Sequence, residues 1–309
     1  MKREFLLFAF LFSLLCFNAE AQHQSKLDSL TYSLKTQSDS LKIYTYGKML
    51  ALVLDSDTVA AQSILWEQWE LAKNMDVPKL MAVAKRDKAR LYFNQANYKE
   101  AKNTLKEGSE LFLSVEDSIG YANILDDLSK IAFYEGEVNN AQELALTAIQ
   151  IKERLNASDS ELIKGYISLG NYQSNTRRYE TSLKYYKMAN SIAVKASDTA
   201  MIAKSNHMLG LNMQWLKRYE EAIGYQQTSI AFNKKLGNDK DWVRTLNSLG
   251  FTYFKMDSLT RAKQIFNQAL SLNQATNNRT DQLYNYTNLG EVSLREKAPK
   301  EAIENLSKA

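Results

Sequence analysis

Few side chains in this sequence could carry out catalysis. The chain of 309 residues holds two histidines, His23 and His207, and one cysteine, Cys16. Nucleophilic catalysis needs a hydroxyl or thiol held against a general base, and that base is most often histidine. A Ser-His-acid site would have to be built around His207, and the sequence has no phosphate-binding loop, dinucleotide-binding glycine motif or histidine pair at metal-ligand spacing. We therefore expect no enzyme, no metal site and no cofactor.

The charge of the chain argues against nucleic-acid binding. There are 39 basic and 35 acidic residues, which give a net charge of +4. These charges are scattered along the chain, whereas a phosphate-binding surface needs a concentrated basic stripe. We expect the partner of this segment to be a protein or peptide.

The N-terminus has the pattern of a secretory signal peptide. Lys2 and Arg3 precede an apolar run over residues 5–17, and the small-x-small site Ala19-Glu20-Ala21 follows. The run is too short for a membrane span, which takes about 20 residues, so we predict a signal peptide over residues 1–21 with cleavage after Ala21. Leu15 precedes Cys16 where the bacterial lipoprotein motif has a small residue, which disfavours a lipoprotein. The sequence predicts an exported protein of the periplasm or cell envelope.

The sequence contains a repeat with a period of 40 residues. Leu-Gly recurs at Leu169-Gly170, Leu209-Gly210, Leu249-Gly250 and Leu289-Gly290, each 40 residues after the last. Twelve residues after each glycine comes a small residue, and the same spacing extends backwards to Met49. With 2 Pro and 11 Gly in the chain, helices are favoured over many short strands. The period predicts about seven pairs of helices that pack through their small residues.

This pattern resembles the tetratricopeptide repeat. Leu249, Gly250, Tyr253, Ala262, Phe266 and Ala269 match the family pattern throughout. Elsewhere Gln226 and Leu306 replace the second aromatic residue, so the packing there should be looser or differently distributed. The resemblance implies an all-α, right-handed superhelical solenoid of antiparallel helix pairs over residues 38–309. The family's unit is about 34 residues long, so six extra residues should make each helix pair taller.

Residues 22–37 fall outside the repeat. Leu27, Leu30 and Leu34 have helical spacing, which predicts an N-terminal capping helix. The seventh repeat ends soon after Leu306, so we expect the array to be incomplete at the C-terminus, with an effector domain possible beyond residue 309.

The resemblance also implies where a ligand would bind. His207, Leu211 and Trp215 are spaced four residues apart on one face of a first helix, and in the family that face lines the peptide-binding groove. The candidate groove residues are Lys164, Asn171, His207, Leu211, Trp215, Arg244, Asn247, Phe251 and Phe254. Aromatic anchors beside amide and basic side chains suit an extended peptide. The alternative is that these residues pack between turns of the superhelix or against another domain of the same chain.

Triplets of Asp, then Ser or Thr, then an apolar residue recur along the chain, as at Asp28, Asp39, Asp57, Asp117 and Asp198. They are typical of helix N-caps, and they also resemble an acceptor motif for O-glycosylation of exported bacterial proteins.

Long-period arrays of this kind resemble those that precede sensor kinases and helix-turn-helix regulators in bacteria. The leading hypothesis is an extracytoplasmic peptide-binding scaffold that serves as the sensory module of a longer signal-transduction protein. A stand-alone periplasmic assembly or adaptor factor is the alternative, and an enzyme is a distant third.

Overall fold

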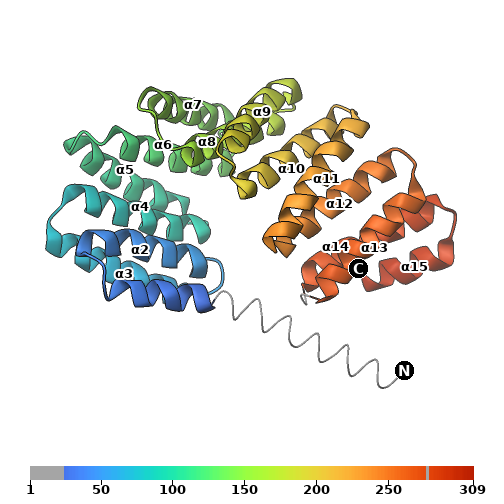
Figure 1. Ribbon diagram of the computed structural model, residues 1–309, viewed down its shortest axis with the longest axis horizontal. Helices are drawn as coiled ribbons and strands as arrows, with labels where there is room; N and C mark the ends of the chain where they lie inside the picture. Colours follow the sequence, from blue (N-terminus) through green and yellow to red (C-terminus); the bar gives the residue numbers. More distant parts are fainter. Residues whose placement is uncertain (1–23, 276–277) are drawn as a thin grey trace, which may run out of the picture. The chain divides into compact units, whose positions relative to one another are not determined.

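The computed structural model describes residues 24–275 and 278–309, and these residues are helical with no strand. The predicted all-α fold of consecutive helix pairs is confirmed (Figure 1). The predicted signal peptide over residues 1–21, which contains Cys16, lies outside the described residues, and so does His23.

The helices fall into two compact units that divide between Glu161 and Leu162. The N-terminal unit holds a helix over residues 24–34, then α2 (Asp39–Val53), α3 (Thr58–Met75), α4 (Pro78–Asn94), α5 (Tyr98–Ser114), α6 (Ser118–Tyr134) and α7 (Val138–Arg154). The C-terminal unit begins within α8 (Asp159–Asn175) and continues with α9 (Tyr179–Lys195), α10 (Thr199–Trp215), α11 (Tyr219–Leu236), α12 (Asp239–Lys255), α13 (Leu259–Ala275), α14 (Arg279–Arg295) and α15 (Pro299–Lys308).

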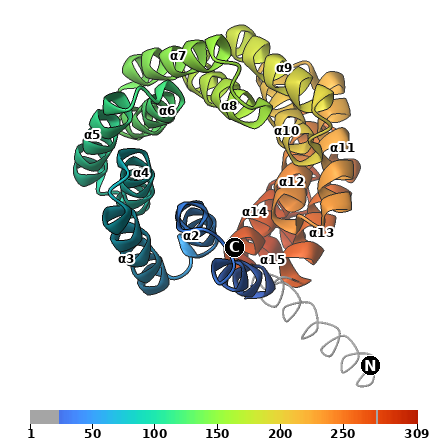
Figure 2. The ribbon, with the colours of Figure 1, turned by 60° about the vertical axis from the view of Figure 1, so that its left-hand side comes forward.

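The first helix of each pair, called the A helix here, carries an even number, and the second, the B helix, carries an odd number. Each A helix contacts the B helix that follows it. A helices also touch one another: α2 touches α4 and α4 touches α6 in the N-terminal unit, and α10 touches α12 and α12 touches α14 in the C-terminal unit. In the N-terminal unit the B helices α3, α5 and α7 lie along the outer side of the A helices (Figure 2). The A helices therefore form a layer of their own on which a ligand could lie.

Helix and turn lengths explain the period of the sequence. Helices of 17 residues, such as α9 and α10, alternate with three-residue turns such as 196–198 and 216–218, which together make a 40-residue unit. Most turns hold one residue in the left-handed conformation, for example Lys217 with φ 59° and Asp257 with φ 58°. The turn over residues 155–158 is one residue longer, so the frame shifts by one residue just before the second unit begins.

The recurrent glycines allow close packing within a helix pair. A Cβ atom on Gly250 would lie 2.6 Å from the ring of Phe266, so only glycine leaves room for that ring. In the preceding repeat the aliphatic part of Gln226 lies against Gly210 instead. The side chain of Gln226 then accepts a hydrogen bond of 2.9 Å from Oγ1 of Thr252 on the next A helix. Packing here is differently distributed, since the amide adds a polar link to the next repeat.

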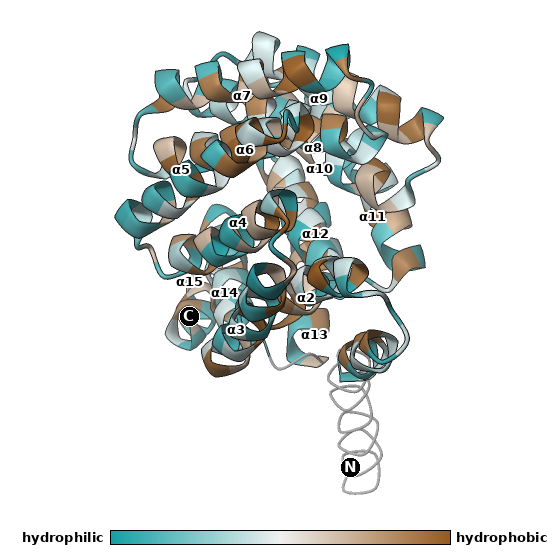
Figure 3. Ribbon diagram, turned by 90° about the vertical axis from the view of Figure 1, so that its left-hand side faces the viewer, coloured by the Kyte–Doolittle hydropathy of each residue, from teal (hydrophilic) through white to brown (hydrophobic). Residues whose placement is uncertain are grey.

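The helix over residues 24–34 packs against the first repeat. Leu27, Leu30 and Leu34 contact the apolar cluster that contains Met49 and Leu50. Apolar residues are distributed over all the helices, with polar residues between them (Figure 3). Among the described residues, no helix combines the length and the apolar character that crossing a membrane requires.

Three of the acidic triplets cap helices. The side chains of Asp57, Asp117 and Asp198 each accept a hydrogen bond from the backbone N–H three residues on, at 2.9, 2.8 and 3.0 Å. In contrast, Asp28 lies inside the helix over residues 24–34 and accepts from Nε2 of Gln24. The capping interpretation therefore holds at these three aspartates. It is wrong at Asp28 and also at Asp39, because Asp39 is the first residue of α2 and Ser38 occupies the N-cap position. Glycosylation stays a prediction.

Candidate functional site

The nine groove residues predicted from sequence lie on three A helices of the C-terminal unit. Lys164 and Asn171 are on α8, His207, Leu211 and Trp215 on α10, and Arg244, Asn247, Phe251 and Phe254 on α12. The structure gives them different environments, which separate residues that hold the helices together from residues that a ligand could reach.

His207 lies between two A helices. Its side chain is 6% exposed, and Nδ1 lies 3.2 Å from Oγ1 of Thr245 on α12. Burial, followed by the charge of Arg244, lowers the pKa of His207 to about 4, against a smaller opposing effect of Asp241. The ring is therefore neutral at pH 7, and a ligand on the A layer would pass over it without direct contact.

Asn247 makes the same kind of contact one repeat later. Its Oδ1 accepts a hydrogen bond of 2.6 Å from Nδ2 of Asn285 on α14. The two partners are 38 residues apart in this pair and in the pair of His207 with Thr245. Both residues thus join successive A helices.

Trp215 is the most exposed of the predicted anchors. Its side chain is 61% exposed, and one face of the indole stacks on Tyr179 with ring centroids 5.8 Å apart and an angle of 4° between the planes. The other face is open to a ligand. Leu211, one turn earlier on the same helix, is half-buried.

Phe251 and Phe254 form a second aromatic surface on α12. Their ring centroids are 6.4 Å apart, and both side chains are half-buried. The amino group of Lys255 lies 4.8 Å from the centroid of Phe251, and the guanidinium of Arg295 lies 5.5 Å from that of Phe254. These rings are already covered in part by cations, a contact that stabilises exposed aromatic side chains by about 0.5–1 kcal/mol.

The remaining polar candidates are exposed. Arg244 pairs with Asp241 on its own helix at 2.8 Å, and Oδ1 of Asn171 accepts a hydrogen bond of 2.7 Å from the hydroxyl of Tyr186. Lys164 is exposed on α8. The structure therefore brings Phe251 and Phe254 together on α12, while Trp215 lies at the end of α10.

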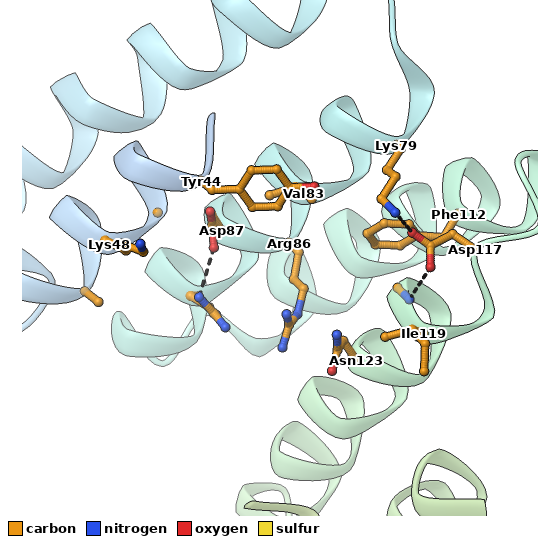
Figure 4. Close-up of a pocket in the computed structure, with 14 residues that line it drawn as sticks. Tyr44, Lys48, Lys79, Val83, Arg86, Asp87, Phe112, Asp117, Ile119 and Asn123 are labelled. Carbon is orange, nitrogen blue, oxygen red and sulfur yellow. Dashed lines mark hydrogen bonds and ion pairs between the residues drawn. The ribbon is translucent and has the colours of Figure 1, made fainter. Parts of the chain in front are cut away.

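A cavity of about 640 Å³ lies on the A layer of the N-terminal unit, and sequence reasoning missed it. Its walls come from α2, α4 and α6 and from the end of α5 (Figure 4). The lining residues are Tyr44, Gly47, Lys48, Ala51, Lys79, Val83, Arg86, Asp87, Arg90, Phe112, Asp117, Ile119, Gly120 and Asn123. Its size falls within the range of ligand-binding clefts.

Arg86 on α4 is held by a carboxylate of the next repeat. Its Nε donates a hydrogen bond of 2.5 Å to Oδ2 of Asp127 on α6. Burial alone would lower the pKa of Arg86, but Asp127 raises it. Burial alone would likewise raise the pKa of Asp127, while Arg86, then Lys130, hold it far below its usual range. Both groups stay charged, and the pair fixes the direction of the guanidinium.

Both carboxylates that line the cavity, Asp87 and Asp117, are already paired. Lys79 lies 2.8 Å from Asp117, and its hydrogen bond to that carboxylate raises the pKa of Lys79. Asp87 accepts hydrogen bonds from Arg90 at 2.9 Å and from Nε2 of Gln68 at 2.8 Å. By contrast, Lys48 makes no ion pair with any described residue of the chain and is exposed. The lining of the cavity thus includes both a lysine without an ion-pair partner and an arginine held in place by Asp127.

The comparisons with known proteins agree with this architecture. Residues 201–275 match a family model described as tetratricopeptide repeat. A comparison with curated proteins gave no significant match.

Several solved structures share the fold. A Rap protein complexed with Competence and Sporulation Factor has a TM-score of 0.65 at 17% identity, over 99% of this chain and 87% of that one. A STAND signal-transduction ATPase with a tetratricopeptide repeat sensor, from Pyrococcus horikoshii, has a TM-score of 0.69 at 17% identity, over 91% of this chain and 48% of that one. This chain therefore spans about half the length of the ATPase. BtubC from P. vanneervenii has a TM-score of 0.61 at 18% identity, over 69% of this chain and 88% of that one.

Proposed function

We propose that this helical repeat protein, which has repeats of the tetratricopeptide type, is an extracytoplasmic scaffold that binds an extended protein segment. We further propose that it is the sensory input module of a longer signal-transduction protein. Helical arrays of this kind are scaffolds for protein interaction, because stacked repeats expose long continuous surfaces.

The exposure of Trp215 carries the binding proposal. A tryptophan side chain gains free energy when it leaves water, and buried aromatic anchors dominate the energetics of protein interfaces. Trp215 nevertheless leaves 61% of its surface exposed on an A helix. A ligand that covers the open face of its indole would gain this contact, with Leu211 beside it as an apolar neighbour.

The similar structures support a sensory role. One is a Rap protein complexed with Competence and Sporulation Factor, and another contains a repeat array described as a sensor. The basic residues, apolar run and small-x-small site of the N-terminus support export. Export is tested by fusing residues 1–30 to a reporter that is active only outside the cytoplasm. We expect activity from this fusion and none when charged residues interrupt the apolar run, and equal activity of the two would contradict export.

Binding is tested by selecting peptides from a displayed random library on the purified chain without its predicted signal peptide. We expect the double variant Trp215→Ala, Phe254→Ala to lose the selected peptides while its free energy of unfolding changes by about 1 kcal/mol or less, since neither residue is fully buried. Trp66→Ala is the matched control, because Trp66 is similarly exposed, at 66%, but lies on the B helix α3. Unfolding of the double variant, or equal loss in the control, would contradict the proposed groove.

A further inference from the structure

We infer that the cavity of the N-terminal unit is a carboxylate-binding subsite, which takes an acidic residue of a bound peptide together with its apolar neighbour. The inference rests on the proposed binding function and adds the class of ligand to it. Arg86 and Lys48 would contact the carboxylate, and Val83, Phe112 and Ile119 would contact the apolar side chain.

Arg86 has donors left over for a ligand. Only its Nε is bonded to Asp127, and its terminal nitrogens donate no hydrogen bond to any described residue. A guanidinium presents five N–H donors in a planar fork. With Nε bonded to Asp127, the edge formed by its two terminal nitrogens is left to bind a carboxylate bidentately. Because Asp127 already fixes the side chain, little rotational freedom is lost when a second carboxylate binds the open edge.

The balance of charge in the cavity favours an anion. Asp117 is paired with Lys79, Asp87 with Arg90, and Asp127 with Arg86 and Lys130. Lys48, which lines the cavity from α2, has no carboxylate among the described residues within ion-pair distance. Figure 4 shows Lys48 on α2 and Arg86 on α4 along the same cavity. A ligand carboxylate would supply the partner that Lys48 lacks.

The apolar walls of the cavity favour a ligand that carries an apolar side chain beside its carboxylate. Phe112 closes the cavity against Gly120, where a Cβ atom would lie 2.3 Å from the ring, and Ile119 and Val83 continue this apolar wall. A small free anion would leave these surfaces in contact with water. A peptide with an apolar residue next to its carboxylate would cover them, so charge and shape together favour an acidic peptide over a free anion.

The test uses labelled synthetic peptides and the whole chain without its predicted signal peptide. The probe carries a single Glu-Phe pair in a Gly-Ser background with an amidated C-terminus, and matched probes carry Gln-Phe, Glu-Gly or a free C-terminal carboxylate after Phe. We expect the Glu-Phe probe to bind about tenfold more tightly than the Gln-Phe and Glu-Gly probes, the size of one good charged contact. If the free-carboxylate probe binds more tightly than the Glu-Phe probe, the subsite takes the carboxylate of a chain end. If the Glu-Phe probe binds more tightly, the subsite takes the carboxylate of an internal side chain. Equal binding of all probes would overturn the inference.

Variants locate the effect. Lys48→Glu should weaken the binding of the Glu-Phe probe about tenfold or more. Lys106→Glu makes the same charge change on the exposed face of α5 and should not weaken this binding. Arg86→Lys keeps a positive charge for Asp127 but removes the planar guanidinium. It should therefore also weaken the binding of the Glu-Phe probe. Because Lys48 is exposed and unpaired, its variant should fold even if the Arg86 variant does not. If selected peptides bind to Trp215 and Phe254 while none of these variants changes acid preference, the scaffold function stands and this inference fails.

Discussion

At the scale of single residues, the position of His207 in the repeat determines what it does. It stands three residues before Gly210, as Asn247 stands three residues before Gly250. Both side chains reach across to the next A helix. Arg86 has the same place before Ala89, and it too reaches the next A helix, where it meets Asp127. One repeat position thus joins neighbouring repeats by imidazole, amide or guanidinium, which helical spacing alone could not reveal.

The buried imidazole should make folding depend on pH. The pKa of histidine in an unfolded chain is near 6.5, whereas burial lowers the pKa of folded His207 to about 4. Between these values the unfolded state binds the extra proton, so the free energy of unfolding should fall as the pH falls from 7 to 4, by on the order of 3 kcal/mol from this residue. His207→Asn, which copies Asn247, should remove this part of the pH dependence and leave stability at pH 7 close to that of the parent chain. Urea unfolding of both proteins at pH 7 and pH 4 measures the difference, and identical pH slopes would show that His207 is not the cause.

At the scale of helices, the sequence predicts the helix pairs well, because the glycine of each Leu-Gly motif packs closely against the following B helix in the structure. Gly170, Gly250 and Gly290 each lie against the side chain sixteen residues later. The cavity could not be predicted in this way. Its charge depends on which carboxylates meet which cations across α2, α4 and α6, and that pairing requires the lateral order and rotation of three helices.

Two glycines of the C-terminal unit test the packing argument. Gly250→Ala should destabilise the chain by about 1–3 kcal/mol, because its methyl group would be forced into the ring of Phe266. Gly224→Ala is the control, since no atom lies within 4 Å of the Cβ position in that helix, and it should stabilise by about 0.5–1 kcal/mol through helix propensity. Denaturant unfolding of both variants decides the matter. A stabilising Gly250→Ala would mean that the ring moves aside at little cost.

At the scale of the whole chain, stability should be distributed by repeat. In such arrays each repeat contacts only its neighbours, so the effect of a core mutation should weaken with distance along the chain. Ile124 is fully buried in one apolar cluster of the N-terminal unit, and Phe266 in one of the C-terminal unit.

Ile124→Ala should therefore speed hydrogen exchange in residues 24–161 far more than in residues 162–275, with a cost of about 2–5 kcal/mol at the site. Phe266→Ala should give the opposite distribution, which makes it the matched control. Exchange followed peptide by peptide measures both. Uniform loss of protection in either variant would show that the two units unfold as one.

The turns have a consequence for how such a chain can change its length. Lys217, Asp257 and Lys297 follow one another at 40-residue intervals with φ of 59°, 58° and 57°. Excising residues 218–257 would bring Ser258 directly after Lys217, in a turn of the same backbone shape, and would leave every other helix with an intact partner. Each such 40-residue segment, called a cassette here, has ends of the same backbone shape, although the side chains on its surface differ. The stretch of ligand that the protein can cover should therefore lengthen or shorten in steps of one cassette, with no need to redesign a junction.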